Sequence, residues 1–149
     1  RQGSSFLGLK ACPEGTEYVL IHDSARPFVS KRLVDDLLAS ARVNGAAGPV
    51  ITLSDTVVEL AGRVVSSVPE RDNLRRIQTP QVFRYDLILR AHEEALQKGI
   101  TAASDDCALV LVSGGRVGIV DGEEDNIKIT GARDMALAEM ILAGKTSRA

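Results

Sequence analysis

An apolar strand, a polar loop and an amphipathic helix follow one another early in the sequence, and this order restricts the fold most strongly. Residues 18–22 form a β-rich apolar run, as expected of a strand buried on both faces. Ser30 is suited to cap a helix, Asn44-Gly45 to end it, and residues 46–53 to form the next strand. This strand–helix–strand order predicts a right-handed βαβ unit in a mostly parallel sheet. The apolar positions of the helix are Leu33, Val34, Leu37, Leu38 and Ala41.

The middle of the chain interrupts this alternation with a hairpin pattern. Two alternating runs, 56–60 and 64–68, flank a short loop that contains Gly62, which is typical of a β-hairpin. A lone hairpin is marginally stable in water. We therefore expect an arm over about residues 54–73 that packs on something else, such as a second subunit.

The second half of the chain returns to helices and strands. We expect a helix over 85–98, another starting at Ser104 as its cap, a strand over 117–120, and a terminal helix over 132–143 with a frayed tail beyond it. With 149 residues, 44% hydrophobic and 26% charged, the chain has the size and composition of one globular domain. The predicted fold class is α/β: an open, mostly parallel sheet with helices on both faces and a projecting hairpin.

Composition excludes several classes of function. A formal net charge of −2 and no run of Lys and Arg argue against a nucleic-acid partner. No apolar run approaches the roughly 20 residues that a membrane helix needs, and we expect no signal peptide. Cys12 and Cys107 match no metal pattern, and reduced thiols in a cytoplasmic protein are the favoured interpretation.

Two loops that follow predicted strands carry the candidate chemistry, because open α/β sheets bind ligands beyond the carboxyl ends of their strands. In the first loop, Asp23 is suited to bind Mg²⁺ or a ribose hydroxyl, and Arg26 to bind a phosphate with two hydrogen bonds. A structural Asp–Arg pair explains the same spacing equally well. In the second loop, Lys128 is suited to stabilise charge on a phosphoryl group. From the sequence alone, a surface lysine is the favoured interpretation of Lys128.

The arm and the histidines are less informative. The hairpin and its exit contain Thr56, Arg71, Arg75 and Arg76. Arg71 is suited to bind an anion, although a solvated charge run is favoured from the sequence alone. His22 and His92 have no partner at metal-ligand or catalytic-triad spacing. We expect His22 to pack at a strand end and His92 to lie exposed on a helix.

Five stretches of the chain resemble, in the same order, the motifs of one enzyme family. They are the R-Q-x-S start with Gly8-Leu9, the H-D-x-A-R-P loop at 22–27, the T-P-Q-x-F segment at 79–83, the helix start at 104–106 and the D-N-I-K-I-T segment at 125–130. Each motif is moderately specific, and five in order are strong. The chain is identified as similar to the 2-C-methyl-D-erythritol 4-phosphate cytidylyltransferases over nearly its whole length.

This resemblance implies a Rossmann-like nucleotidyltransferase fold over residues 1–149 and a homodimer whose hairpin arms clasp the neighbouring subunit. It implies transfer of CMP from CTP to methylerythritol phosphate in the non-mevalonate isoprenoid route, with Mg²⁺ bridging the triphosphate and Asp23 as the one candidate metal ligand. The expected catalytic residues are Asp23, Arg26 and Lys128. The expected substrate-binding residues are Thr56, Arg71, Thr79 and Ser104, and the expected nucleotide-binding residues are Ser4, Asp23, Ser24 and Lys128.

The resemblance also has a departure and leaves alternatives open. Such enzymes open with a strand and a Gly-rich loop that holds the triphosphate, and the chain starts after that motif, so we expect an N-terminally incomplete domain that binds CTP poorly by itself. The sister family of ribitol-5-phosphate cytidylyltransferases shares most of these motifs. A third interpretation is a non-catalytic dimerisation or binding module that keeps the fold without the nucleotide loop.

Overall fold

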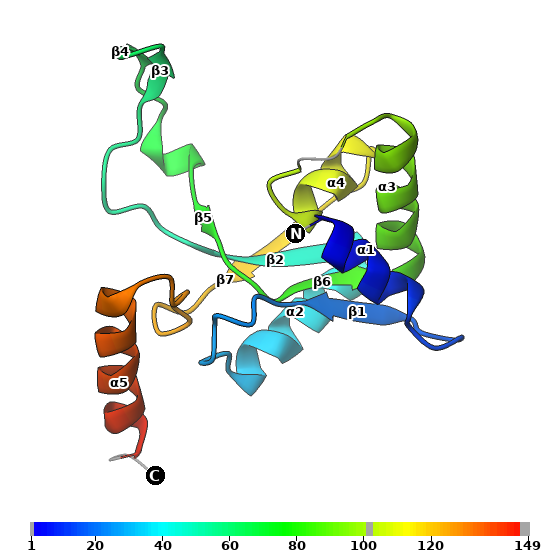
Figure 1. Cartoon of the computed structure of the whole chain (residues 1–149), viewed down its shortest axis with the longest axis horizontal. Helices are drawn as coiled ribbons and strands as arrows, with labels where there is room; N and C mark the ends of the chain where they lie inside the picture. The colour runs from blue at the N-terminus through cyan, green and yellow to red at the C-terminus, as the bar shows by residue number, and fades with distance from the viewer. Residues whose placement is uncertain (1, 101–102, 147–149) are drawn as a thin grey trace.

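The computed structural model describes residues 2–100 and 103–146 of the chain (Figure 1). An α/β fold is present, as predicted, and Arg1 of the R-Q-x-S start lies outside the described residues. The helices are α1 (Gln2–Lys10), α2 (Lys31–Asn44), α3 (Tyr85–Gln97), α4 (Asp106–Val112), α5 (Ala132–Thr146) and the short 3₁₀ helix η1 (Arg71–Asn73). The strands are β1 (Tyr18–Ile21), β2 (Ala46–Ile51), β3 (Glu59–Ala61), β4 (Val64–Ser67), β5 (Arg76–Ile77), β6 (Gln81–Arg84) and β7 (Gly118–Asp121).

The main sheet is mixed, which corrects the expectation of mostly parallel pairing. Strand β6 lies between β1 and β2 and is antiparallel to both, β5 is also antiparallel to β2, and β7 is parallel to β2. Strands β1, β2 and β7 therefore run in one direction, and the segment 76–84 runs against them. The physical reason is the arm: the chain leaves β2 and returns without a crossover helix, and such a connection brings the next strand back antiparallel.

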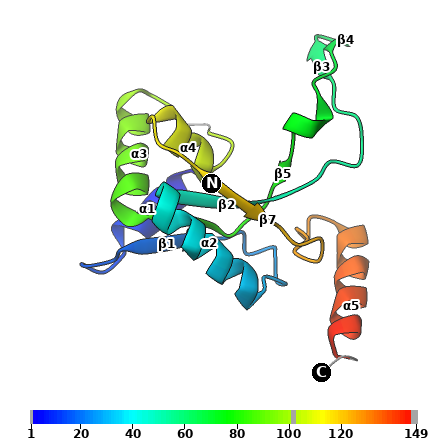
Figure 2. The ribbon, with the colours of Figure 1, turned by 180° about the vertical axis from the view of Figure 1, so that it is seen from behind.

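Helices cover both faces of this sheet, as predicted (Figures 1 and 2). Side chains of a strand alternate between the faces. Ala46 and Phe83, which are paired across β2 and β6, face the core formed with α1, α3 and α4. Their neighbours Ala47 and Val82 face the core formed with α2. The α2 residues in this second core are Leu33, Leu37 and Ala41, all at 0% exposure.

Local signals at both ends of α2 act as the sequence predicted. The Ser30 hydroxyl accepts a hydrogen bond from the Leu33 N–H, which satisfies one of the unpaired amides of the first turn. Gly45 ends the helix in the left-handed conformation, at φ 84°, and its N–H donates to the Ala41 carbonyl. The helix is thereby fixed in length immediately before β2, and its apolar face is held against the sheet.

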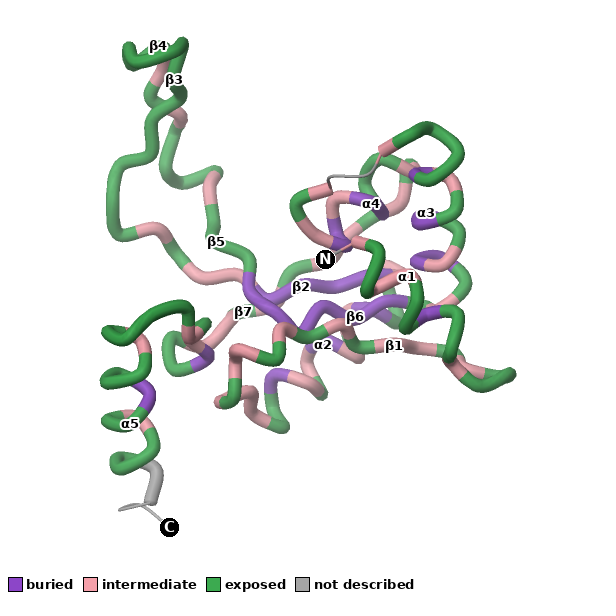
Figure 3. The backbone as a smooth tube through the Cα atoms, viewed as in Figure 1, coloured by how far each residue is buried: buried purple, intermediate pink, exposed green. Residues whose placement is uncertain are grey.

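The arm, residues 54–73, projects from the body of the protein (Figure 1). It contains the two-stranded β3–β4 ladder with Gly62 at φ 65° in its turn, so the predicted hairpin is confirmed with shorter strands. Figure 3 shows that the arm is almost entirely exposed. Its exposed apolar side chains include Leu60, Val64 and Val65, at 62%, 69% and 54% exposure.

Two expectations about side chains were wrong. His92 is 2% exposed rather than on the surface, and its Nε2 lies 2.9 Å from Oδ1 of the buried Asp106. The first turn of α4 is capped by Asp105, whose carboxylate accepts from the Ala108 N–H, while Ser104 remains exposed. Asp105 replaces Ser104 because the helix starts one residue later than the sequence pattern indicated.

The terminal helix α5 extends beyond the predicted end at residue 143 through Thr146, and the rest of the predicted frayed tail, residues 147–149, lies outside the described residues. It stands apart from the sheet in Figures 1 and 2, and Ala138 is its one buried apolar residue among those described. Across residues 2–100 and 103–146, no helix is long and apolar enough to cross a bilayer.

Candidate active site

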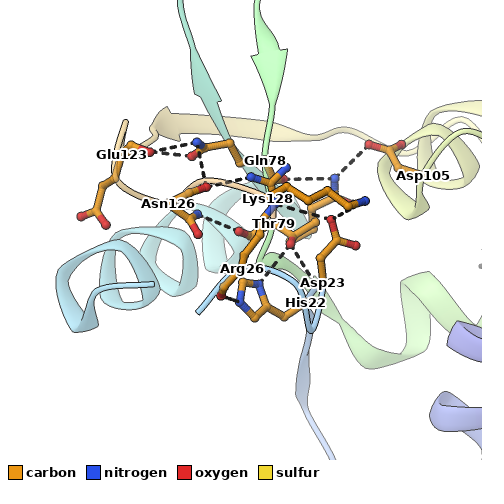
Figure 4. A network of polar contacts seen from close by, with 10 residues as sticks. His22, Asp23, Arg26, Gln78, Thr79, Asp105, Glu123, Asn126 and Lys128 are labelled. Carbon is orange, nitrogen blue, oxygen red and sulfur yellow. Dashed lines mark hydrogen bonds and ion pairs between the residues drawn. The ribbon is translucent and has the colours of Figure 1, made fainter. Parts of the chain in front are cut away.

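Three loops meet at one end of the sheet and carry the polar residues singled out in the sequence (Figure 4). The first follows β1, the second connects β5 with β6, and the third follows β7. Because β1, β2 and β7 run in the same direction, their carboxyl ends lie at the same edge of the sheet. This is the edge at which open α/β sheets bind ligands.

The centre of this site is the Asp23 cluster, which consists of Asp23, Arg26 and Lys128. The Oδ2 atom of Asp23 lies 3.2 Å from Lys128 Nζ and 3.4 Å from Arg26 Nε. The side chains of Arg26 and Asp23 are only 12% and 15% exposed, whereas that of Lys128 is 45% exposed. One carboxylate therefore holds two cations side by side. Lys128 is the more exposed of the two, so its side chain can turn toward a ligand. The structure thus brings together the three residues predicted to be catalytic.

Backbone contacts fix Arg26 in this position. Its Nη1 donates to the Asn126 carbonyl at 2.7 Å, and the Ile129 N–H donates to the Ala25 carbonyl at 2.9 Å. Both contacts join the loop after β1 to the loop that carries Lys128. Arg26 is therefore held by the main chain of the other loop as well as by the Asp23 side chain.

Thr79 joins the second loop, between β5 and β6, to this cluster. The Asp23 N–H donates to Thr79 Oγ1 at 2.9 Å, and Thr79 Oγ1 lies 3.1 Å from His22 Nδ1. His22 Nε2 lies 2.9 Å from the Arg26 carbonyl. A ring protonated on Nε2 donates to that carbonyl and accepts the threonine hydroxyl at Nδ1. His22 thus orients Thr79 and the loop around Arg26. From the sequence we expected it only to pack at the end of a strand.

Two buried amides complete the support and were missed as functional residues. Asn126 is 0% exposed and donates from Nδ2 to the Thr79 carbonyl at 2.8 Å. Gln78 is 4% exposed; its Nε2 donates to the Glu123 carbonyl at 2.9 Å, and its Oε1 accepts from the Glu123 N–H. Asn126 lies inside a segment that carried the family resemblance, and Gln78 directly precedes another. Their loop positions between strands were the available signal, because buried loop backbone needs side-chain partners.

The serines predicted to bind ligands lie at the side of the site. Ser24, Ser4 and Ser104 are exposed. Helix α1 is tied to the segment around Ser104 by a hydrogen bond from the Ser5 hydroxyl to Asp106 Oδ2, at 3.2 Å. Asp105 in turn accepts from Gln81 Nε2 at 2.9 Å, which links this side to β6. Ser4 and Ser104 therefore lie on adjacent segments, which Gln81 and Asp105 link to β6.

The two arm residues of the predicted site lie outside the cluster of the same chain. Thr56 and Arg71 are both exposed, and Arg71 Nη1 lies 3.4 Å from the Ser54 carbonyl within the arm. The arm projects away from the sheet in both ribbon views. These residues complete a site only if the arm reaches another subunit, as the sequence predicted.

A pocket of about 330 Å³ opens beside the cluster. Three cationic side chains line it, Arg26, Arg76 and Lys128, together with two carboxylates, Glu124 and Asp134. A larger hollow, of about 600 Å³, lies against the start of α5, but Glu139 is its one charged lining residue. The smaller pocket is therefore the better candidate for binding an anion such as a phosphate.

The wall of this pocket at α5 is held by Asp134. Its Oδ2 accepts from the Thr130 hydroxyl, the Thr130 N–H and the Gly131 N–H, at 2.7, 2.8 and 3.0 Å. The hydrogen bond from the Thr130 hydroxyl, followed by the two backbone hydrogen bonds, lowers the pKa of Asp134 below its ordinary value. The carboxylate thus joins the D-N-I-K-I-T segment to the first turn of α5.

The carboxylates available for a metal are few. Within residues 2–100 and 103–146, no group of three or more His, Cys, Asp or Glu side chains is placed to hold a metal ion. Asp23 is the one carboxylate in contact with both cations of the cluster. Mg²⁺ commonly binds through one or two carboxylates together with substrate phosphates. Asp23 is therefore the residue of the cluster that would hold a Mg²⁺ ion together with the phosphates of a bound substrate.

Comparison with known proteins connects this site to one family. The sequence profile of 2-C-methyl-D-erythritol 4-phosphate cytidylyltransferase matches residues 1–144. The chain is 45% identical, over 144 residues, to the 2-C-methyl-D-erythritol 4-phosphate cytidylyltransferase of Desulforamulus reducens. The match covers 95% of this chain and 61% of that protein, so the chain spans less than two thirds of the relative.

Solved structures give the same result for the fold. The crystal structure of 2-C-methyl-D-erythritol 4-phosphate cytidylyltransferase from Thermus thermophilus superposes with a TM-score of 0.85 at 41% identity, over 95% of this chain and 69% of that one. The 4-diphosphocytidyl-2C-methyl-D-erythritol synthase from Anaerococcus prevotii superposes with a TM-score of 0.88 at 36% identity, over 96% and 64%. The predicted Rossmann-like nucleotidyltransferase fold is confirmed.

Proposed function

Since the chain belongs to the 2-C-methyl-D-erythritol 4-phosphate cytidylyltransferase family, we propose that the protein transfers CMP from CTP to 2-C-methyl-D-erythritol 4-phosphate. The products are 4-diphosphocytidyl-2-C-methyl-D-erythritol and pyrophosphate, and the reaction is a step of the non-mevalonate isoprenoid route. The observation that carries the proposal is the Asp23 cluster, in which two cations share one carboxylate beside a pocket of suitable charge.

In the proposed reaction, an oxygen of the alcohol phosphate attacks the α-phosphorus of CTP, and the bond from that phosphorus to the pyrophosphate oxygen breaks. The protein forms no covalent bond, so its contribution is positioning and stabilisation of charge. Arg26, held by the Asn126 carbonyl, binds the phosphate of the attacking alcohol phosphate. Lys128 moves from Asp23 to the α-phosphate, where negative charge increases in the transition state.

Asp23 keeps both cations in place before the substrates arrive. When Mg²⁺ is bound with the nucleotide, it neutralises charge on the triphosphate, and Asp23 is the residue that would hold it. Thr79 positions Asp23 through the Asp23 N–H, and we propose that its hydroxyl and that of Ser104 line the pocket for the alcohol. Ser4 and Ser24 are proposed to contact the nucleotide.

We also propose that the protein works as a cytoplasmic homodimer. The apolar side chains along the exposed arm support this assembly, because an isolated hairpin is marginally stable in water. In the dimer, Thr56 and Arg71 of one subunit would contact the substrate phosphate in the site of the other. The two widely separated cysteines support a reducing compartment.

The first test is an assay of CTP-dependent pyrophosphate release in the presence of Mg²⁺, with the protein at the full length that its gene encodes. Methylerythritol phosphate and ribitol 5-phosphate are compared in parallel. We expect release with methylerythritol phosphate and little with ribitol 5-phosphate. Preference for ribitol 5-phosphate would assign the protein the chemistry of the sister family, and no release with either substrate would contradict the proposed enzyme and favour a binding module. Removal of Mg²⁺ with EDTA should abolish release.

A further inference from the structure

Arg76 lies at the point where the arm rejoins the sheet, and the proposed reaction has not yet assigned it a role. It is the first residue of β5, paired with Ile51 of β2, and its side chain lines the 330 Å³ pocket that Arg26 and Lys128 also line. Asp23 contacts the other two cations, Arg26 and Lys128. Arg76 is therefore a third cation at this pocket that the Asp23 cluster does not account for.

The contacts of Arg76 are much weaker than those of Arg26. Its Nη2 lies 3.8 Å from Glu124 Oε2, and the two side chains are 55% and 75% exposed. An ion pair this long and this exposed contributes little to stability. Arg26, by comparison, is 12% exposed and bound to the Asn126 carbonyl at 2.7 Å. The pocket therefore combines one fixed cation with one that is held loosely and is easily displaced by a stronger anion.

The other lining residues indicate which anion suits this side of the pocket. Ile51, Ile77 and Ile127 give it an apolar wall next to the cations. Its volume is at the lower end of the range for small-ligand sites. A small alcohol phosphate matches this combination, because it carries one dianionic phosphate on a short carbon chain with a methyl branch. A nucleoside triphosphate is larger and polyanionic, and it suits the apolar wall less well.

We propose that Arg76 is a substrate-binding residue contributed by the same chain, which leaves Glu124 and binds the phosphate of the alcohol phosphate with its guanidinium group. The proposal rests on the proposed function for the identity of the substrate. Glu124 competes with the substrate for Arg76 and so sets the affinity of the pocket for a phosphate. A planar guanidinium binds two phosphate oxygens at once, which an ammonium group does not do.

The variant Arg76→Ala tests the proposal in steady-state kinetics of the full-length enzyme. We expect the KM for the alcohol phosphate to rise about tenfold, as for loss of a hydrogen-bonded charge pair, with the KM for CTP unchanged. Arg76→Lys should recover part of the loss. The matched control is Arg75→Ala, since Arg75 is also an exposed arginine of this segment, binds the carbonyls of Asp72 and Leu74, and does not line the pocket.

Glu124→Gln is a second variant, and we expect it to change the KM for the alcohol phosphate in the opposite direction. Removing the competing carboxylate should lower the KM for the alcohol phosphate about two- to threefold, within the range of an exposed ion pair. In the double variant with Arg76→Ala this gain should disappear, because the two residues act on each other. An unchanged KM in Arg76→Ala, an equal effect of Arg75→Ala, or an effect on CTP instead would overturn the assignment of Arg76.

Titration with inorganic phosphate, followed by calorimetry, separates failure of this proposal from failure of the proposed function. If the parent enzyme releases no pyrophosphate, the proposed function is wrong, and the titration still decides the role of Arg76. About tenfold weaker phosphate binding in Arg76→Ala than in Arg75→Ala would support an anion site at Arg76. Equal binding in the two variants would overturn it.

Discussion

At Asp23, one carboxylate oxygen serves two cations whose surroundings differ. Arg26 is nearly buried and also bound by a carbonyl, whereas Lys128 is 45% exposed and contacts Asp23 at 3.2 Å. Such an exposed ion pair contributes little to folding stability. Lys128 can therefore be removed at small structural cost, which makes it the residue of the cluster best suited to separate a catalytic from a structural role.

We expect Lys128→Ala to lower kcat about 100-fold or more, because the proposed role is stabilisation of charge that appears in the transition state. The free energy of unfolding should change by less than about 1 kcal/mol, since Lys128 is 45% exposed and Asp23 keeps its ion pair with Arg26. Pyrophosphate release measures kcat, and urea unfolding measures the free energy of unfolding. The control is Lys31→Ala, which removes an 88% exposed lysine from α2. Turnover close to that of the parent would show that Lys128 is not catalytic.

Sequence reasoning predicted the three residues of the Asp23 cluster but not the residues that hold them. Their charges and their positions after strands made Asp23, Arg26 and Lys128 candidates, and the family resemblance then favoured catalytic roles over a structural pair and a surface lysine. Gln78 and Asn126 act through backbone carbonyls of residues about 45 positions away. Such contacts depend on how the loops meet in space, which no local pattern encodes.

At the scale of secondary structure, the best-predicted elements are those defined by local contacts. The cap, apolar face and end of α2 all follow from residues within one or two turns. The expectation of a mostly parallel sheet was wrong because the direction of β6 depends on the path of the arm. His92 was wrongly predicted to be exposed because histidine is a polar residue. Its spacing of four residues from Ile88 places it on the buried face of α3.

The start of α5 provides a prediction for pH dependence. The lowered pKa of Asp134 means that its contacts stabilise the fold above the ordinary aspartate value of 3.8 and that this contribution is lost as the pH falls through the lower pKa of the folded state. Asp134→Ala should therefore speed amide hydrogen exchange at Thr130 and Gly131 at pH 7, and the difference from the parent should shrink in acid. Glu139→Ala removes a carboxylate further along the same helix and should leave these amides unchanged. An equal difference at both pH values would contradict the charge-dependent contact.

At the scale of the whole molecule, the exposed arm and the compact sheet carry different parts of the proposed site. The Asp23 cluster and the pocket are built from the sheet edge, while Thr56 and Arg71 lie on the arm (Figures 1 and 3). If the arm completes the site of a second subunit, each active site combines residues from two chains. The isologous contacts of a two-fold dimer then give two such sites.

This arrangement predicts complementation between two inactive variants. Arg71→Ala impairs the arm and Lys128→Ala impairs the sheet edge. In a mixed dimer, one site receives both defects and the other receives none. Allowing the two variants to exchange subunits in equal amounts should restore about one quarter of the parent activity, because about half of the dimers are mixed and each has one intact site. Pyrophosphate release before and after exchange measures the recovery. Absence of recovery, with exchange shown by mass spectrometry, would place Arg71 in the site of its own chain.

The uninterrupted segment from η1 through β6 carries Arg71, Arg76 and Thr79 within nine positions of one another. Docking of the arm and filling of the pocket would therefore act on the same short piece of backbone. Two binding events that favour the same arrangement of one segment strengthen each other by an equal factor. The affinity for the alcohol phosphate would then rise with enzyme concentration, and a saturating amount of that substrate would shift the equilibrium from monomers toward the dimer by mass action.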